Sequence, residues 1–148
     1  MKKLLLIGGT GGIGTQLLKH LSKKYDVLSI GSKELDVKSK TDCDVFFDKN
    51  KFDIVINLSG VNYDSFVHKL SEEKINNMID VNIKGSINVV SSCLKSMRDS
   101  KYGRIVLISS ILAEKTIMGT SIYSGCKSFL DKFVKNISLE NIGLGITS

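Results

Sequence analysis

The chain has 148 residues, the length of one domain with one sizeable hydrophobic core. Its net charge of +6 is spread along the sequence without a basic block or a nucleic-acid motif, so we expect no nucleic-acid partner. No apolar run approaches the ~20 residues that span a bilayer, and none forms a signal peptide, so we expect no membrane partner and a cytoplasmic location. Widely spaced cysteines without a Cys/His cluster predict free thiols and no metal site: Cys43, Cys93, Cys126.

The beginning of the chain combines a strand, a glycine-rich turn and a helix. Residues 2–7 are a short apolar run, residues 8–14 read Gly-Gly-Thr-Gly-Gly-Ile-Gly, and an amphipathic helix follows with Leu17, Leu18 and Leu21 among lysines. Glycines let the backbone approach a pyrophosphate, to which the helix N-terminus offers free N–H groups. We therefore predict a dinucleotide-binding turn. The alternative is a flexible loop that binds nothing, and the flanking strand and helix argue against it.

Strands and helices alternate along the rest of the chain. The pattern predicts a strand at 26–30, a helix at 41–50, a strand at 53–58, a helical region from 71 to about 97 with a break near Asn82, a strand at 104–108, a helix at 121–138 and a strand that begins within 142–148. Leu35, Asp36 and Val37 form either a short edge strand or no strand, because a parallel crossover needs about a dozen or more residues.

This alternation predicts one dinucleotide-binding domain over residues 1–148, an α/β fold with a Rossmann-type doubly wound parallel sheet. In such a sheet, ligands bind outside the carboxyl ends of the strands. Gly8, Gly31, Asn57 and the pair Ser109-Ser110 all follow predicted strands. We therefore expect them at one edge of the sheet.

Tyr123 and Lys127 stand four residues apart on a predicted helix, which places them on one face. A nearby ammonium favours the phenolate and lowers the pKa of a tyrosine, so that the phenol can exchange a proton with a substrate oxygen near neutral pH. Ser110 lies thirteen residues upstream of Tyr123. Plain surface helices also carry such Tyr/Lys pairs, so the prediction of a catalytic site depends on the glycine turn as an independent signal.

The motifs resemble those of the short-chain dehydrogenase/reductase family, in particular its 3-oxoacyl-carrier-protein-reductase-like branch. Gly8-x-x-x-Gly12-x-Gly14 matches the family's Thr-Gly-x-x-x-Gly-Ile-Gly, with Ile7 in place of the threonine. Asp36-Val37 resembles the pair that contacts adenine in the family.

Three later segments extend the resemblance over the whole chain. Asn57-Leu58-Ser59-Gly60 resembles the family's Asn-Asn-Ala-Gly, with two substitutions. Asn82 and Ser110 lie in segments similar to those that hold the family's catalytic asparagine and serine. The ordered set is far more specific than any one motif.

The resemblance implies an NAD(P)-dependent enzyme that interconverts a small-molecule carbonyl and a secondary alcohol by hydride transfer. It implies that Tyr123 is the general acid or base, and that Lys127 lowers its pKa and holds the nicotinamide ribose. Ser110 would hydrogen-bond the substrate oxygen, and Asn82 would hold a water linked to Lys127. The implied cofactor-binding residues are Gly8, Thr10, Gly12, Ile13, Gly14, Ser32, Lys33, Asp36, Val37, Asn57, Ser59, Gly60, Tyr123 and Lys127. The resemblance also implies a homo-oligomer, either a dimer or a tetramer.

The cofactor preference depends on the residues after the second predicted strand. Ser32 and Lys33 could hold a 2′-phosphate and favour NADP, whereas Glu34 favours NAD if its side chain turns inward. Gly11 stands where many NADP-preferring relatives carry a basic residue, which weakens the case. We predict NADP, with NAD as the alternative.

Family members continue well past the strand predicted to begin within 142–148, so we expect this chain to lack the last strands and the substrate lobe. We therefore predict weak cofactor binding and little or no turnover for the 148-residue form. Two alternatives remain: a non-catalytic nucleotide-binding protein, and an oligomerisation module built from the two long helices.

Overall fold

The computed structural model describes all 148 residues. The elements along the chain are β1 (Lys3–Ile7), α1 (Gly12–Leu21), β2 (Asp26–Ile30), α2 (Lys40–Lys49), β3 (Ile54–Asn57), η1 (Val67–Lys69), α3 (Glu72–Ile79), η2 (Asp80–Lys84), α4 (Gly85–Ser100), β4 (Gly103–Leu107), η3 (Ile111–Ala113), α5 (Ser121–Glu140) and β5 (Ile146–Thr147). None of the helices is both long and apolar enough to cross a membrane.

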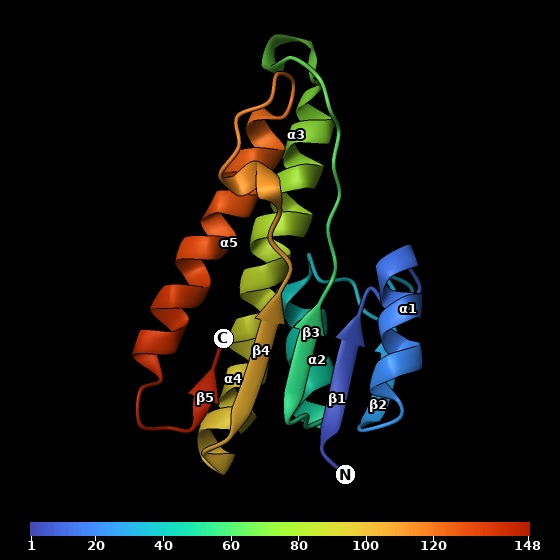
Figure 1. The fold of residues 1–148 in the computed structure, drawn as a ribbon, viewed down its shortest axis with the longest axis vertical. Helices are drawn as coiled ribbons and strands as arrows, with labels where there is room; N and C mark the ends of the chain where they lie inside the picture. Colours follow the sequence, from blue (N-terminus) through green and yellow to red (C-terminus); the bar gives the residue numbers. More distant parts are fainter.

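Five parallel strands form one sheet in the order β2-β1-β3-β4-β5 (Figure 1). The chain first runs outward from β1 to β2 and then crosses back to β3 on the other side of β1. The predicted α/β fold with a parallel Rossmann-type sheet is confirmed. β1 and β3 flank the point where the strand order reverses, which is where sheets of this kind bind ligands.

The hydrophobic core lies between the sheet and the pair α2 and α4, which cover one face (Figure 1). Leu5 and Val55, on adjacent strands, pack there with Phe47 of α2 and with Val89 and Met97 of α4. Side chains of a strand alternate between the two faces of the sheet, so Leu4 and Leu6 point the other way, yet they are also buried. Burial on both faces explains why β1 reads as a continuous apolar run.

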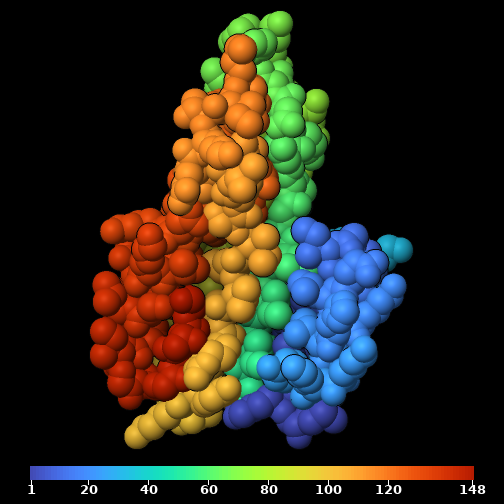
Figure 2. All heavy atoms as spheres, in the orientation of Figure 1, coloured from blue at the N-terminus to red at the C-terminus, as the bar shows by residue number.

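The opposite face of the sheet is covered unevenly. α1 lies over β1 and β2, whereas Val106 of β4 and Ile108 just beyond it are 40% and 37% exposed. Figure 2 shows the yellow-orange atoms of this region open to view between the blue N-terminal part and the red C-terminal helix. An apolar strip on β4 is therefore left in contact with solvent.

Several details of the predicted elements can be compared with the structure. The predicted break near Asn82 is confirmed, because η2 is a single turn of π-helix between α3 and α4. Leu35–Val37 contains no strand, which was one of the two possibilities. The strand predicted within 142–148 is shorter than expected, because Gly143 and Gly145 adopt positive φ in the turn that precedes β5.

Candidate active site

The glycine turn packs tightly between β1, β2 and α1. Gly8 has φ of +77°, and the N–H groups of Gly8 and Gly9 donate to the carbonyl of Ile30 at 2.9 and 3.0 Å. A Cβ atom at Gly14 would lie 2.5 Å from the Gly8 carbonyl oxygen, whereas one at Gly12 would meet nothing within 4 Å. The turn thus needs glycine for packing at one end and leaves open space at the start of α1.

The N-terminus of α1 has no side-chain cap. Its N-cap residue is Gly11, so the first N–H groups of the helix keep no side-chain partner. A Cβ atom at Gly12, the first residue of α1, would meet no other atom within 4 Å. Free N–H groups, a positive helix end and room for a ligand fit a pyrophosphate.

A cavity of about 540 Å³ opens beside this turn. Its lining comes from the glycine turn, the loop after β2, the segment after β3 and one residue of η2: Ile7, Gly8, Thr10, Gly11, Ser32, Leu35, Asp36, Val37, Lys38, Leu58, Ser59, Gly60, Val61 and Val81. The first three of these segments follow the carboxyl ends of the neighbouring strands β1, β2 and β3. Seven of the fourteen cofactor-binding residues predicted from the sequence line the cavity: Gly8, Thr10, Ser32, Asp36, Val37, Ser59 and Gly60.

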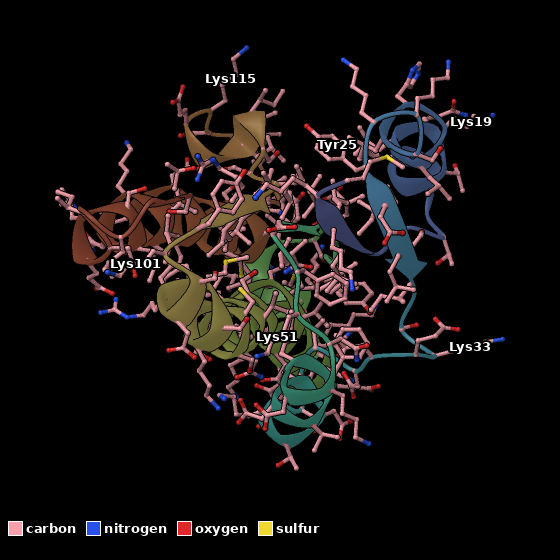
Figure 3. All side chains as sticks on the ribbon, turned by 90° about the horizontal axis from the view of Figure 1, so that it is seen from below. Lys19, Tyr25, Lys33, Lys51, Lys101 and Lys115 are labelled. Atoms are coloured by element: carbon pink, nitrogen blue, oxygen red, sulfur yellow. The ribbon has the colours of Figure 1, made fainter.

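The charged residues of the loop after β2 bear on cofactor choice, and their side chains lie in different places. Ser32 lines the cavity, but Lys33 does not, and Figure 3 shows the side chain of Lys33 pointing away from the molecule. The Glu34 carboxylate accepts a hydrogen bond from the Gly31 N–H at 2.8 Å. Lys38 lines the cavity, although the sequence motifs did not single it out.

The segment after β3 is shaped by Asn57, which is buried. Its Oδ1 accepts hydrogen bonds from the N–H and the hydroxyl of Ser59, at 3.0 and 2.5 Å. This local turn places Ser59 and Gly60 against the cavity. Asn57 is thus a residue that shapes the site, while its neighbours line it.

Asn82, which is fully buried in η2, fastens the same segment. Its Nδ2 donates to the carbonyl oxygens of Val61 and Met78, both at 2.8 Å, and its Oδ1 accepts from the Val61 N–H at 3.3 Å. A Cβ atom at Gly60 would come within 3.0 Å of Asn82 Oδ1 and 3.5 Å of Lys127 Nζ. Asn82 and Lys127 therefore approach the segment after β3 at the same residue, Gly60.

Lys127 is only 5% exposed, and its Nζ donates to the carbonyl oxygen of Ile108 at 2.7 Å. The ammonium lies 5.5 Å from the centroid of the Tyr123 ring. Burial lowers the pKa of Lys127 from its ordinary value. A cation is thus held at the carboxyl end of β4 beside the phenol, as predicted from their spacing on one helix.

Ser110 lies on the loop after β4, where its Oγ accepts a hydrogen bond from the Leu112 N–H at 3.2 Å. No hydrogen bond joins it to Tyr123. Because the serine oxygen is used here as an acceptor, its own hydroxyl proton stays free to be donated. The neighbouring Ser109 donates to the Lys127 carbonyl at 3.4 Å, which ties this loop to α5.

Comparison with known proteins decides the family. The profile described as "short chain dehydrogenase" matches residues 28–147, most of the chain. The chain belongs to the short-chain dehydrogenase/reductase family. The matched segment includes Asn82, Ser110, Tyr123 and Lys127, and it begins after the glycine turn.

Two of the similar curated proteins are named as reductases. The acetoacetyl-CoA reductase of Shinella zoogloeoides is 35% identical over 100 residues, which are 68% of this chain and 42% of that enzyme. The 3-oxoacyl-[acyl-carrier-protein] reductase FabG of Rickettsia felis is 29% identical over 99% of this chain and 69% of its own length. The alignments thus span from under half to about two thirds of these relatives.

Solved structures agree on the fold. A short-chain dehydrogenase from Streptomyces avermitilis superposes with a TM-score of 0.91 at 19% identity, over 99% of this chain and 63% of that one. ElxO with NADP bound superposes with a TM-score of 0.87 at 24% identity, over 99% and 71% of the two chains.

Proposed function

We propose that this chain is the nucleotide-binding and catalytic part of an NADP-dependent oxidoreductase that interconverts a carbonyl compound and a secondary alcohol. The observation that carries the proposal is the placement of Lys127, buried at the carboxyl end of β4 beside Tyr123 and in reach of Gly60. A buried ammonium beside a phenol on the ligand-binding edge of the sheet is suited to proton transfer.

The chain's own residues supply placement and proton transfer, while the nicotinamide supplies or accepts the hydride when it is bound. In the direction of reduction, Tyr123 gives its phenolic proton to the carbonyl oxygen. The Lys127 ammonium favours the phenolate that remains. Ser110 keeps its proton and donates a hydrogen bond from its hydroxyl to the same oxygen, which stabilises the charge that develops there.

The glycine turn and the start of α1 provide space and free N–H groups for the pyrophosphate of the cofactor. Gly8 and Gly14 bring the turn and α1 into close contact, and the space beside Gly12 is open. Uncapped N–H groups at the start of α1 would hold the phosphate oxygens.

Two features after β2 support NADP over NAD. Ser32 and Lys38 both line the cavity, whereas the exposed side chain of Lys33 points away from the molecule (Figure 3). A 2′-phosphate would find a hydroxyl and a cation here. The Glu34 carboxylate, in contrast, turns back to the end of β2 and accepts a hydrogen bond from the Gly31 N–H, which is the arrangement that favours NAD, the alternative cofactor.

The exposed strip at Val106 and Ile108 supports the proposal that the whole protein includes further residues that cover this face and complete the substrate site. Such a protein would be a homo-oligomer, either a dimer or a tetramer, which light scattering would test. The exposed face of the sheet equally favours a second candidate function, in which a protein of this length binds nucleotide without turnover.

Two measurements test the proposal. Calorimetric titration of the folded 148-residue protein should show binding of NADPH, with NADH weaker. The names of the relatives make acetoacetyl-CoA the first carbonyl substrate to test, by following NADPH oxidation. If neither dinucleotide binds, the proposed function is wrong. If NADPH binds but no carbonyl is reduced, even by a protein extended past Ser148, the binding function without turnover is favoured.

A further inference from the structure

The loop between β2 and α2, residues 31–39, is fastened to α4 by a single side chain. Nδ2 of Asn88 donates to the carbonyl oxygens of Val37 and Lys38, at 2.9 and 3.1 Å. One turn earlier on α4, a Cβ atom at Gly85 would lie 2.8 Å from Val37 Cγ2. The Val37 side chain therefore packs against Gly85 of α4, and Asn88 of the same helix holds the backbone of Val37 and Lys38 by two hydrogen bonds.

This loop needs an external fastening because it contains no helix or strand. Its internal hydrogen bonds join residues 31, 34 and 35 at one end and residues 36, 38 and 39 at the other, for example from the Leu35 N–H to the Gly31 carbonyl, at 3.2 Å, and from the Ser39 N–H to the Asp36 carbonyl, at 3.0 Å. These bonds shape two turns, but they tie the loop only to itself. A longer contact at 3.8 Å joins the thiol of Cys43 on α2 to the Val37 carbonyl. The two bonds from Asn88 are the stronger polar link to the body of the protein, in which Leu35 and Val37 also pack as part of the hydrophobic core.

The fastened stretch is also the part of the loop that lines the cavity. Leu35, Asp36, Val37 and Lys38 form one wall of it, and the first and third of these are buried while the other two are exposed. A wall that is already in place spares the ligand the entropic cost of ordering it.

We propose that Asn88 is a positioning residue for the adenosine half of the dinucleotide. It touches neither cofactor nor substrate, and it acts by holding the 36–38 backbone in its binding geometry. The inference rests on the proposed function, since it requires that the cavity bind a dinucleotide.

Three substitutions of Asn88 and one matched control test whether its two hydrogen bonds position the loop. Asn88→Ala removes both donated bonds, and Asn88→Asp keeps the size but turns an acceptor carboxylate toward two carbonyl oxygens. Each should raise the Kd for NADPH roughly tenfold, with the larger effect in Asn88→Asp. Asn88→Gln keeps the donor and should recover part of the affinity. Asn136→Ala makes the same change at an exposed helical asparagine of α5 and should leave the Kd unchanged.

Hydrogen exchange without nucleotide separates positioning from general stability. In Asn88→Ala, the amides of residues 31–39 should exchange faster while those of β1 and β3 keep their wild-type rates, and NADPH should restore the loop's protection. Wild-type NADPH affinity in both Asn88→Ala and Asn88→Asp would overturn the inference and leave the proposed function standing, as would faster exchange spread evenly over the protein. Failure of the wild-type protein to bind NADPH or NADH would instead overturn the proposed function, and this inference with it.

Discussion

The ammonium of Lys127 lies 2.7 Å from the carbonyl oxygen of Ile108, the residue that precedes the Ser109-Ser110 pair. This bond spans from α5 to the end of β4 and holds a charge in a place from which water is largely excluded. The same ammonium approaches Gly60 and the Tyr123 ring. One buried cation thus links the serine loop, the cofactor segment and the proposed proton donor.

Burial of Lys127 makes its contribution to stability depend on pH. Its pKa is lowered from 10.5, so the fold disfavours the charged form, and this cost is fully present at pH values below the lowered pKa. As the pH rises through the lowered pKa, the folded protein loses this proton before the unfolded chain does, and the cost is relieved.

Lys127→Met removes that titration. We expect the wild-type protein to gain free energy of unfolding relative to Lys127→Met as the pH rises toward 10.5, the ordinary pKa of lysine. Urea unfolding at several pH values measures the difference. A difference that stays constant, or that moves in favour of the variant, would contradict the buried, desolvated ammonium.

Gly12→Val should block the cofactor without disturbing the fold, because a Cβ there meets nothing within 4 Å. The new side chain would fill the space proposed for the pyrophosphate, so we expect NADPH binding to fall by two orders of magnitude or more, with little change in Tm. Gly125→Val, at an equally open position on α5, is the control and should bind as the wild type does. Undiminished binding by Gly12→Val would remove the glycine turn from the site.

Lys33→Glu should lower the ratio of NADPH to NADH affinity by on the order of tenfold, since an exposed charge contact with the 2′-phosphate becomes a repulsion. Lys115→Glu changes the net charge equally at an exposed lysine far from the cavity and should keep the wild-type ratio. Titration of each variant with both cofactors gives the answer. If Lys33→Glu also keeps the wild-type ratio, Lys38, which lines the cavity, becomes the cation to test.

Val106→Asn tests whether further residues cover the exposed strip on β4. In the 148-residue protein this side chain is 40% exposed. The substitution should therefore lower the free energy of unfolding by much less than the same substitution at a core position would. In a protein extended past Ser148 the same change should cost about 1.5–3 kcal/mol, the value of burying a valine. Equal effects in the two lengths, measured by chemical unfolding, would show that the strip stays uncovered.

How far the sequence predicted this structure depends on how local each signal is. The glycine turn and the break at Asn82 were predictable, because each follows from a motif a few residues long. The position of Lys38 at the cavity was not predictable from the sequence. It depends on how the loop after β2 folds, through the bond between Glu34 and Gly31 and the two bonds from Asn88. β5 was predicted within residues 142–148, but its start at Ile146 was not, because Gly143 and Gly145 adopt positive φ in the turn before it.

The most direct test of the account is Tyr123→Phe, measured in a protein extended past Ser148. The change keeps the ring and its packing but removes the phenolic proton. We expect NADPH affinity to stay within about twofold and carbonyl-dependent NADPH oxidation to fall by roughly 10²–10⁴-fold. Tyr25→Phe, at a tyrosine between α1 and β2, should keep wild-type activity. Wild-type turnover by Tyr123→Phe would contradict the proposed catalytic role of the Tyr123 and Lys127 pair.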